Sequence, residues 1–269
     1  LIFVFCTIVF VHELGHYLAA RSVGIRVEKF YLGFDFFGLG IKKKIGETEY
    51  GLGAFPFGGY VKVSGIIDES MDDNTTGANY EYLSKNSLQQ LWFTSAGVIM
   101  NILLSIFLFT IIFLKIGISE PSKTTIIGGL IDNYPAKEAG LLIGDEIKSI
   151  NNIKVNTWSQ MTEQIHANPN NKIFILWDRK GNIISDSLLV KSEKNIKNGK
   201  YIEQGMIGII PQYGKSQSIG LINAFQLGIN KTLEWLNLTY QSFLIILNGD
   251  ASLKEIGGPV LIAKMAGES

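Results

Sequence analysis

The residues best suited to chemistry form a short motif, His-Glu-Leu-Gly-His, at positions 12–16. On an α-helix, residues four apart lie on the same face, so His12 and His16 can both bind one zinc ion. Glu13 then lies beside the metal, where a carboxylate can take a proton from an attacking water molecule. The motif therefore predicts zinc-dependent hydrolysis, with Zn²⁺ as the cofactor and Glu13 as the catalytic base.

The chain around this motif is unusual for a soluble metalloprotease. An unbroken apolar run, residues 1–11, leads into His12, whereas a soluble zinc-binding helix is amphipathic. Ionisable groups inside a membrane segment are costly and are usually functional. The alternative is a helix that carries two histidines and no metal, and burying these groups without a partner costs on the order of several kcal/mol. We therefore expect metal binding.

Composition also indicates a membrane protein. The chain has 269 residues, of which 46% are hydrophobic and 18% charged. Lys+Arg and Asp+Glu are equal at 24 each, so the sequence gives no support for nucleic acid as a partner. The single cysteine, Cys6, lies in the apolar run and is expected to pack as a small hydrophobic residue.

Two helices long enough to cross a bilayer core of about 30 Å are predicted, over residues 1–20 and about 92–118. Basic residues follow the first helix directly, so the positive-inside rule places the motif near the cytoplasmic face. The apolar run begins at Leu1 without a methionine, and we expect that part of the first membrane segment is missing.

The remaining chain divides by composition. Residues about 48–64 contain two apolar strands around a Pro/Gly turn, which predicts a hairpin that lies against or enters the bilayer. An ordinary soluble hairpin fits the pattern equally well. Residues 119–214 follow the order strand, short helix, strand, helix, strand pair, a small α+β domain in which His166 is expected at the surface. Residues 215–269 begin with a helix bearing one polar stripe, typical of a membrane interface or a helix bundle.

Five motifs in this order resemble the site-2 protease family of intramembrane zinc metalloproteases, specifically its bacterial RseP-type members. They are the His-Glu-Leu-Gly-His helix, the Pro-Phe-Gly-Gly-Tyr-Val-Lys segment at 56–62, Ala-Gly-Val-Ile-Met-Asn at 96–101, a PDZ-like Tyr-Pro-Ala…Ala-Gly-Leu…Gly-Asp pattern at 134–151, and Gly-Gly-Pro-Val at 257–260. The third motif departs from the family pattern, because Val98 replaces a proline. The resemblance implies a polytopic α-helical membrane protein with a reentrant β-hairpin and an inserted α+β PDZ-like domain, divided at 1–118, 119–214 and 215–269.

The resemblance also implies functional residues and partners. Asn101, Gly58 and Gly59 would contact the substrate, a single-pass transmembrane protein of the anti-sigma-factor or signal-peptide-remnant type. The PDZ-like domain would bind peptide segments on the outer side of a bacterial inner membrane, and the lipid bilayer would be a further partner. The family's third zinc ligand is an aspartate in a Leu-Asp-Gly motif, which this sequence lacks. We expect it beyond Ser269, with Asp250 a poor substitute, so the chain alone is expected to be inactive and to hold zinc weakly.

Two other functions remain open from the sequence. One is a membrane-anchored zinc peptidase whose active site is soluble, but this would need a third ligand in a soluble segment and an amphipathic zinc-binding helix. The other is a non-catalytic membrane scaffold whose working part is the PDZ-like domain. The intact His12, Glu13 and His16 argue against the scaffold, and the absent aspartate argues for it.

Overall fold

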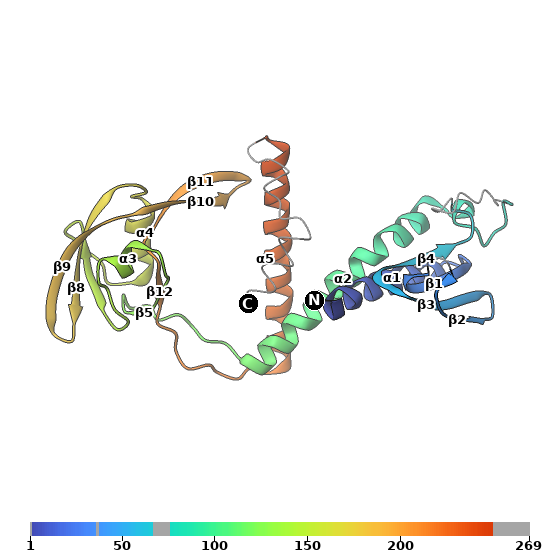
Figure 1. Cartoon of the computed structure of the whole chain (residues 1–269), viewed down its shortest axis with the longest axis horizontal. Helices are drawn as coiled ribbons and strands as arrows, with labels where there is room; N and C mark the ends of the chain where they lie inside the picture. Colours follow the sequence, from blue (N-terminus) through green and yellow to red (C-terminus); the bar gives the residue numbers. More distant parts are fainter. Residues whose placement is uncertain (1, 36–37, 67–75, 250–269) are drawn as a thin grey trace. The chain divides into compact units, whose positions relative to one another are not determined.

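The computed structural model describes residues 2–35, 38–66 and 76–249, without the side chains of residues 56 and 57 (Figure 1). It divides into two units, one built from Leu1–Thr110 and one from Ile111–Ile256. Each unit is a separate structure with its own core. The motif Gly257–Val260, Asp250 and the acidic stretch at 68–73 lie outside the described residues.

Two long helices dominate the first unit: α1 (Ile2–Ser22) and α2 (Ser87–Ile116), whose last residues enter the second unit. Both helices are long and apolar enough to cross a membrane, and only 11% of the most apolar stretch of each is buried within the protein. Phe3, for example, is 82% exposed. An apolar medium such as the core of a bilayer favours the exposure of side chains of this kind. The helices predicted at 1–20 and 92–118 are thus present, with α2 starting five residues earlier.

A four-stranded sheet lies between these helices in the chain, in the order β2 (Gly40–Ile45), β3 (Thr48–Gly53), β1 (Val27–Phe34), β4 (Phe55–Val63). β1 runs parallel to β3 and antiparallel to β4, and β2 is antiparallel to β3. A small core joins the sheet to both helices through Ala20, Ile25, Val27, Val63 and Phe93. This packing fixes β4 beside α1.

The predicted reentrant hairpin over 48–64 is wrong in its pairing. β3 and β4 do not pair with each other, because β1 lies between them and pairs with both. The link between β3 and β4 is Ala54 alone, and it crosses the end of β1. Glycines make this crossing possible: a Cβ on Gly53 would lie 2.3 Å from the backbone of Phe34. Strand order depends on residues far apart in sequence, so the local alternation could not reveal β1 as the central partner.

The second unit contains an α+β module whose elements follow the predicted order. They are β5 (Ile127–Leu130), α3 (Pro135–Glu138), β6 (Glu146–Ile150), β7 (Ile153–Lys154), α4 (Trp158–His166), β8 (Lys172–Arg179) and β9 (Asn182–Leu189). Strands β7, β6, β8 and β9 form one sheet, and β12 (Ile209–Pro211) pairs with β5. Buried aliphatic residues and Trp177 form one continuous core beneath them. His166, expected at the surface, is half-buried at the end of α4.

Three further elements belong to the second unit. A long hairpin of β10 (Lys191–Lys197) and β11 (Lys200–Met206), which the sequence did not predict, connects β9 to β12. Its residues are mostly polar and exposed, so they carry no apolar period. The final helix, α5 (Leu221–Leu247), is the helix with one polar stripe that was predicted at the start of residues 215–269.

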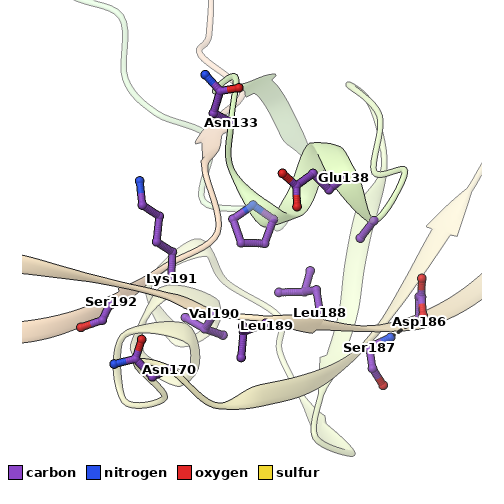
Figure 2. A pocket seen from close by; sticks show the side chains of 12 residues that line it. Asn133, Glu138, Asn170, Asp186, Ser187, Leu188, Leu189, Val190, Lys191 and Ser192 are labelled. Carbon is purple, nitrogen blue, oxygen red and sulfur yellow. Dashed lines mark hydrogen bonds between the residues drawn. The ribbon is translucent and has the colours of Figure 1, made fainter.

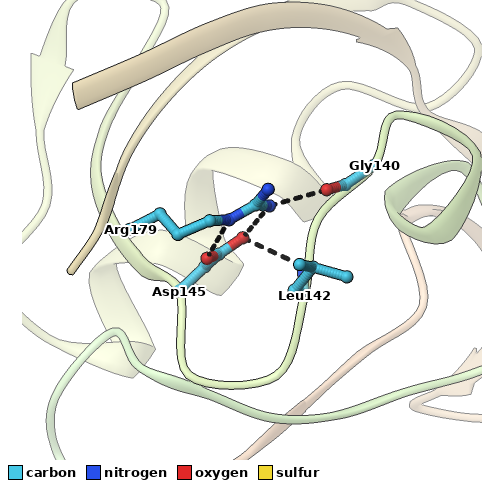
Figure 3. Close-up of polar contacts among 4 residues, drawn as sticks. All are labelled: Gly140, Leu142, Asp145 and Arg179. Carbon is cyan, nitrogen blue, oxygen red and sulfur yellow. Dashed lines mark hydrogen bonds and ion pairs between the residues drawn. The ribbon is translucent and has the colours of Figure 1, made fainter. Parts of the chain in front are cut away.

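An ion pair between the partly exposed Arg179 and the buried Asp145 fixes the loop between α3 and β6 (Figure 3). Arg179 donates to both carboxylate oxygens of Asp145, at 2.8 and 2.7 Å, and to the carbonyl of Gly140 at 2.7 Å. The Leu142 N–H donates to the same carboxylate at 2.8 Å. Burial by itself raises the pKa of Asp145, but these donors outweigh it and hold the pKa below its ordinary value.

Candidate metalloprotease active site

The two histidines of the motif meet on one face of α1. Their Nε2 atoms are 3.2 Å apart, and the rings cross edge to face with centroids 4.8 Å apart. This geometry follows from the i, i+4 spacing on a regular helix. Both side chains are partly buried, so the pair is shielded by neighbouring residues and is not free in solution.

The other ring nitrogens determine which tautomers the histidines adopt. His16 Nδ1 lies 2.8 Å from the carbonyl oxygen of Phe93, which can only accept, so Nδ1 carries the proton. His12 Nδ1 lies 3.4 Å from the amide of Asn101, whose Oδ1 is buried without a hydrogen-bond partner in the described chain. The O and N positions of an amide are assigned from its hydrogen bonds. Exchanging them lets Oδ1 accept from His12 Nδ1–H and satisfies the unpaired atom.

This arrangement fits a shared zinc ion. With both Nδ1 atoms protonated, both Nε2 atoms carry lone pairs and face each other at 3.2 Å. Two nitrogen ligands on one tetrahedral zinc, each about 2.05 Å from the metal, lie about 3.3 Å apart. A backbone carbonyl and a side-chain amide behind metal-binding imidazoles are the usual means of fixing their orientation. His12 and His16 therefore have the spacing and the tautomers of a zinc pair.

Two glycines allow α2 to approach this pair closely. A Cβ on Gly97 would lie 2.6 Å from the Nε2 atoms of both His12 and His16. A Cβ on Gly15 would lie 2.5 Å from the carbonyl oxygen of Ala96. Contacts this short are never made by real Cβ atoms, so each position needs a residue without a side chain. The sequence marked Gly97 only as part of a motif, and its role emerges from the packing of the two helices.

Glu13 lies on the side of α1 that faces β4. Its carboxylate accepts a hydrogen bond from the Val61 N–H. It lines a pocket of about 210 Å³ together with His16, Phe93, Ile66 and the β4 residues 61–63. The base and one of the two imidazoles thus share a cavity whose opposite wall is an extended strand. The sequence marked Lys62 only as the end of the segment at 56–62, and it did not single out Phe93, which reaches the pocket from α2.

The residues predicted to contact the substrate lie at different distances from this pocket. Gly59 packs on α1, where an added Cβ would lie 3.2 Å from Glu13 Cγ. Gly58 has φ +119° and lies beneath the Phe34 ring, which an added Cβ would meet at 2.4 Å. Neither glycine lines the pocket, and Asn101 contacts His12 from the α2 side. Their roles in substrate binding remain predictions.

Within residues 2–35, 38–66 and 76–249, no group of three or more His, Cys, Asp or Glu side chains could hold a metal ion. Asp250 cannot be placed, because it lies outside these residues.

The structure places a histidine pair and a carboxylate, the side chains of a zinc-dependent hydrolase, on a long apolar helix, and comparison with known proteins assigns the family. The model of Peptidase family M50 matches residues 1–269. The chain therefore belongs to this family, the site-2 proteases, which are membrane metalloproteases. Zinc, which the names of its relatives imply, is the metal that the histidine pair fits.

The relatives come from several bacteria and share the name "Putative zinc metalloprotease". The one from Clostridium acetobutylicum is 34% identical over 266 residues, which covers 99% of this chain and 73% of the relative. One from Clostridium perfringens is 32% identical, covering 98% and 73%, and one from Helicobacter pylori is 33% identical, covering 94% and 72%.

Solved structures also resemble part of the chain. The PDZ domain of an SdrC-like protein from Listeria monocytogenes aligns with 35% of this chain and 93% of its own, at 16% identity and a TM-score of 0.28. The corresponding domain from Listeria innocua aligns with 35% and 99%, at 18% identity and a TM-score of 0.27.

Proposed function

We propose that this protein cleaves single-pass transmembrane proteins within the bilayer, as an intramembrane member of its family. The observation that carries the proposal is the pair of Nε2 atoms 3.2 Å apart on a helix whose apolar side chains are largely exposed. A soluble active site would need an amphipathic helix, and α1 is not amphipathic. This distinguishes the proposal from a membrane-anchored peptidase that acts in water.

The catalytic steps follow from the positions of the side chains. A bound zinc ion supplies Lewis-acid polarisation of the scissile carbonyl and of a water molecule. Glu13 takes the proton from the attacking water and delivers it to the leaving amide nitrogen. The Val61 N–H and the packing of Gly59 against Glu13 hold the carboxylate in the pocket. Asn101 and the Phe93 carbonyl orient His12 and His16.

β4 supports a role in presenting the substrate. It is an edge strand of its sheet, paired with β1 on one side only. Its residues 61–63 line the pocket that holds Glu13. Peptide bonds inside a helix are shielded, and a substrate must become extended before attack. We infer that the substrate unwinds along β4, with Gly59 giving the strand room to approach α1 and Gly58 leaving room for the Phe34 ring.

The proposal includes a third ligand and a location. Two histidines are too few for a catalytic zinc site, so an aspartate outside the described residues completes it, as the family resemblance implies. Without that aspartate the chain holds zinc weakly and is inactive.

We place the protein in the bacterial inner membrane, with the motif near the cytoplasmic face and the α+β module, a PDZ-like peptide-binding domain, on the opposite side.

The test compares Glu13→Gln with wild type in proteoliposomes that contain the full-length protein and a single-pass substrate. We expect the variant to keep stoichiometric zinc and to lose cleavage by more than about 10³-fold, because the base is absent while the ligands remain. Glu163→Gln, an exposed carboxylate on α4, serves as the matched control and should cleave normally. Equal cleavage by Glu13→Gln and wild type would refute the assignment.

A further inference from the structure

A groove of about 620 Å³ lies in the second unit. It is bounded by α3 and the turn before it, and by the run from Asp186 to Ser192 (Figure 2). Figure 2 shows Glu138 on one side of this space and Leu188 and Leu189 on the other. Leu189 is 62% exposed here, whereas Leu188 belongs to the core.

The long wall of the groove is the outer edge of a sheet. β9 is the last strand in the order β7-β6-β8-β9, so only β8 pairs with it. In the described chain, Asp186–Leu189 make no backbone-to-backbone hydrogen bond outside that ladder. The next strand, β10, is not free on this side in the same way, because β11 pairs with it along its whole length, from Lys191 opposite Met206 to Lys197 opposite Lys200. β10 has β11 as a partner, but no strand of the described chain pairs with the corresponding free edge of β9.

The direction of the backbone groups can be derived from the ladder. Ser187 is paired with Phe174, whose N–H and C=O both bind Asn151 on the other side, at 2.9 and 2.8 Å. Val190 does the reverse and exchanges both of its bonds with residues 170 and 171 on the β8 side. Since antiparallel pairs alternate, Ser185, Ser187 and Leu189 direct their N–H and C=O groups away from β8, and Ser187 and Leu189 line the groove.

One of these backbone groups already has a hydrogen-bond partner in the neighbouring side chain. The Ser187 N–H donates to the side chain of Asp186 at 2.7 Å. Edge strands are commonly protected by charged side chains of this kind. A peptide carbonyl that took over the Ser187 N–H would release the Asp186 carboxylate for a new partner.

The charges around the groove favour a basic partner. Asp186 and Glu138 form no ion pair in the described chain. The lysine of the groove, Lys191, is engaged by Glu193 at 3.1 Å and lies 4.2 Å above the Tyr134 ring. Two carboxylates thus remain to attract cations, one on each wall.

We propose that this groove binds an extended, basic peptide segment of another protein, which adds to β9 as a fifth strand. The outward backbone groups of Ser185, Ser187 and Leu189 form the ladder. The span is five residues, about 16 Å, which is typical of a short strand. Lysine or arginine side chains of the peptide pair with Asp186 and Glu138, and Leu189 contacts an apolar residue between them.

The first test uses the full chain in detergent micelles and a fluorescein-labelled nonapeptide of alternating lysine and valine. Its anisotropy titration should show binding at least tenfold tighter than that of the matching glutamate–valine peptide. The double variant Glu138→Lys/Asp186→Lys should reverse this preference, whereas Glu163→Lys on α4 should not change it. Equal binding of the two peptides, or a preference unaffected by the double variant, would overturn the proposal.

The second test concerns the backbone ladder. N-methylation of every second amide removes the hydrogen-bond donors from one edge of an extended peptide. Two such peptides can be made, one methylated on the odd residues and one on the even residues. One of them should fail to bind, and the other should bind normally. In the protein, Leu189→Pro removes an outward N–H without removing a bond to β8, and it should weaken binding at least tenfold more than Leu189→Ala, which loses the same side-chain contact but keeps the N–H. Normal binding of both methylated peptides would contradict strand addition even if the proline variant failed to fold.

Discussion

Gly97 provides a sensitive test of the site, because its missing side chain is what brings α2 against the histidine pair. In Gly97→Ala the new Cβ would lie 2.6 Å from the Nε2 atoms of His12 and His16. Ordinary contact begins near 3.4 Å, so the rings or the helix must move by about 0.8 Å. Misplacing catalytic groups by about 1 Å can cost 10²-fold in rate. We expect activity to fall about 10²-fold and zinc affinity about tenfold.

The Gly97→Ala substitution should disturb the histidine pair without lowering the stability of α2. Alanine is favoured over glycine inside a helix by about 1 kcal/mol, so α2 itself should not weaken. The matched control is Val98→Ala, one position further along α2, where the side chain is 56% exposed. Zinc affinity is measured by competition with a chromophoric chelator, and activity in proteoliposomes. Wild-type zinc affinity and activity in Gly97→Ala would refute the proposed approach of the two helices.

Two further predictions follow from other parts of the structure. Asn101→Leu should weaken zinc binding by about tenfold, because His12 loses the acceptor that orients its ring, and Asn101→Asp should retain affinity since it still accepts; equal zinc affinities in a chelator competition would contradict this. Asp145→Asn should lower the free energy of unfolding by about 2–3 kcal/mol, since Arg179 and Leu142 lose a charged acceptor. The exposed Asp132→Asn should change it by less than about 0.5 kcal/mol in the same denaturant titration.

The Asp145 pair also predicts a pH dependence with a definite sign. The pKa of Asp145 is lowered in the folded protein, so the unfolded chain binds its proton first as the pH falls. The contribution of the pair is therefore complete above the ordinary value near 3.9 and disappears below it, toward the lower pKa of the folded state. The difference in stability between wild type and Asp145→Asn should shrink between about pH 5 and pH 2. A difference that stayed constant over this range would show that the carboxylate charge contributes nothing.

The sequence predicted those parts of the structure that depend on neighbours along one element. The i, i+4 spacing of His12 and His16 is local, and the structure places both rings on one face of α1. The two apolar runs were equally clear, since helix length and hydropathy need no knowledge of partners. The turn at Lys180–Gly181, where both residues have positive φ, also follows from residue types.

The remaining features depend on contacts between distant segments. The central position of β1 could not be deduced, because its strand pattern does not say that β3 and β4 will flank it. Gly97 and Phe93 act through the crossing of α2 over α1, 77 or more residues from the histidines they meet. Val61 approaches Glu13 only because β4 packs on the same helix. The open edge of β9 likewise results from where β11 ends, which no local pattern encodes.

The central claim is that His12 and His16 bind one zinc ion, and zinc X-ray absorption on the full-length protein tests it most directly. The third histidine, His166 on α4, provides the matched control. Wild type and His166→Ala should show zinc with two imidazole nitrogens at about 2.0–2.1 Å. His12→Ala and His16→Ala should each lose one of these nitrogens, with zinc content reduced at least tenfold after dialysis against a chelator. Full zinc content with an unchanged ligand shell in both variants would contradict the account.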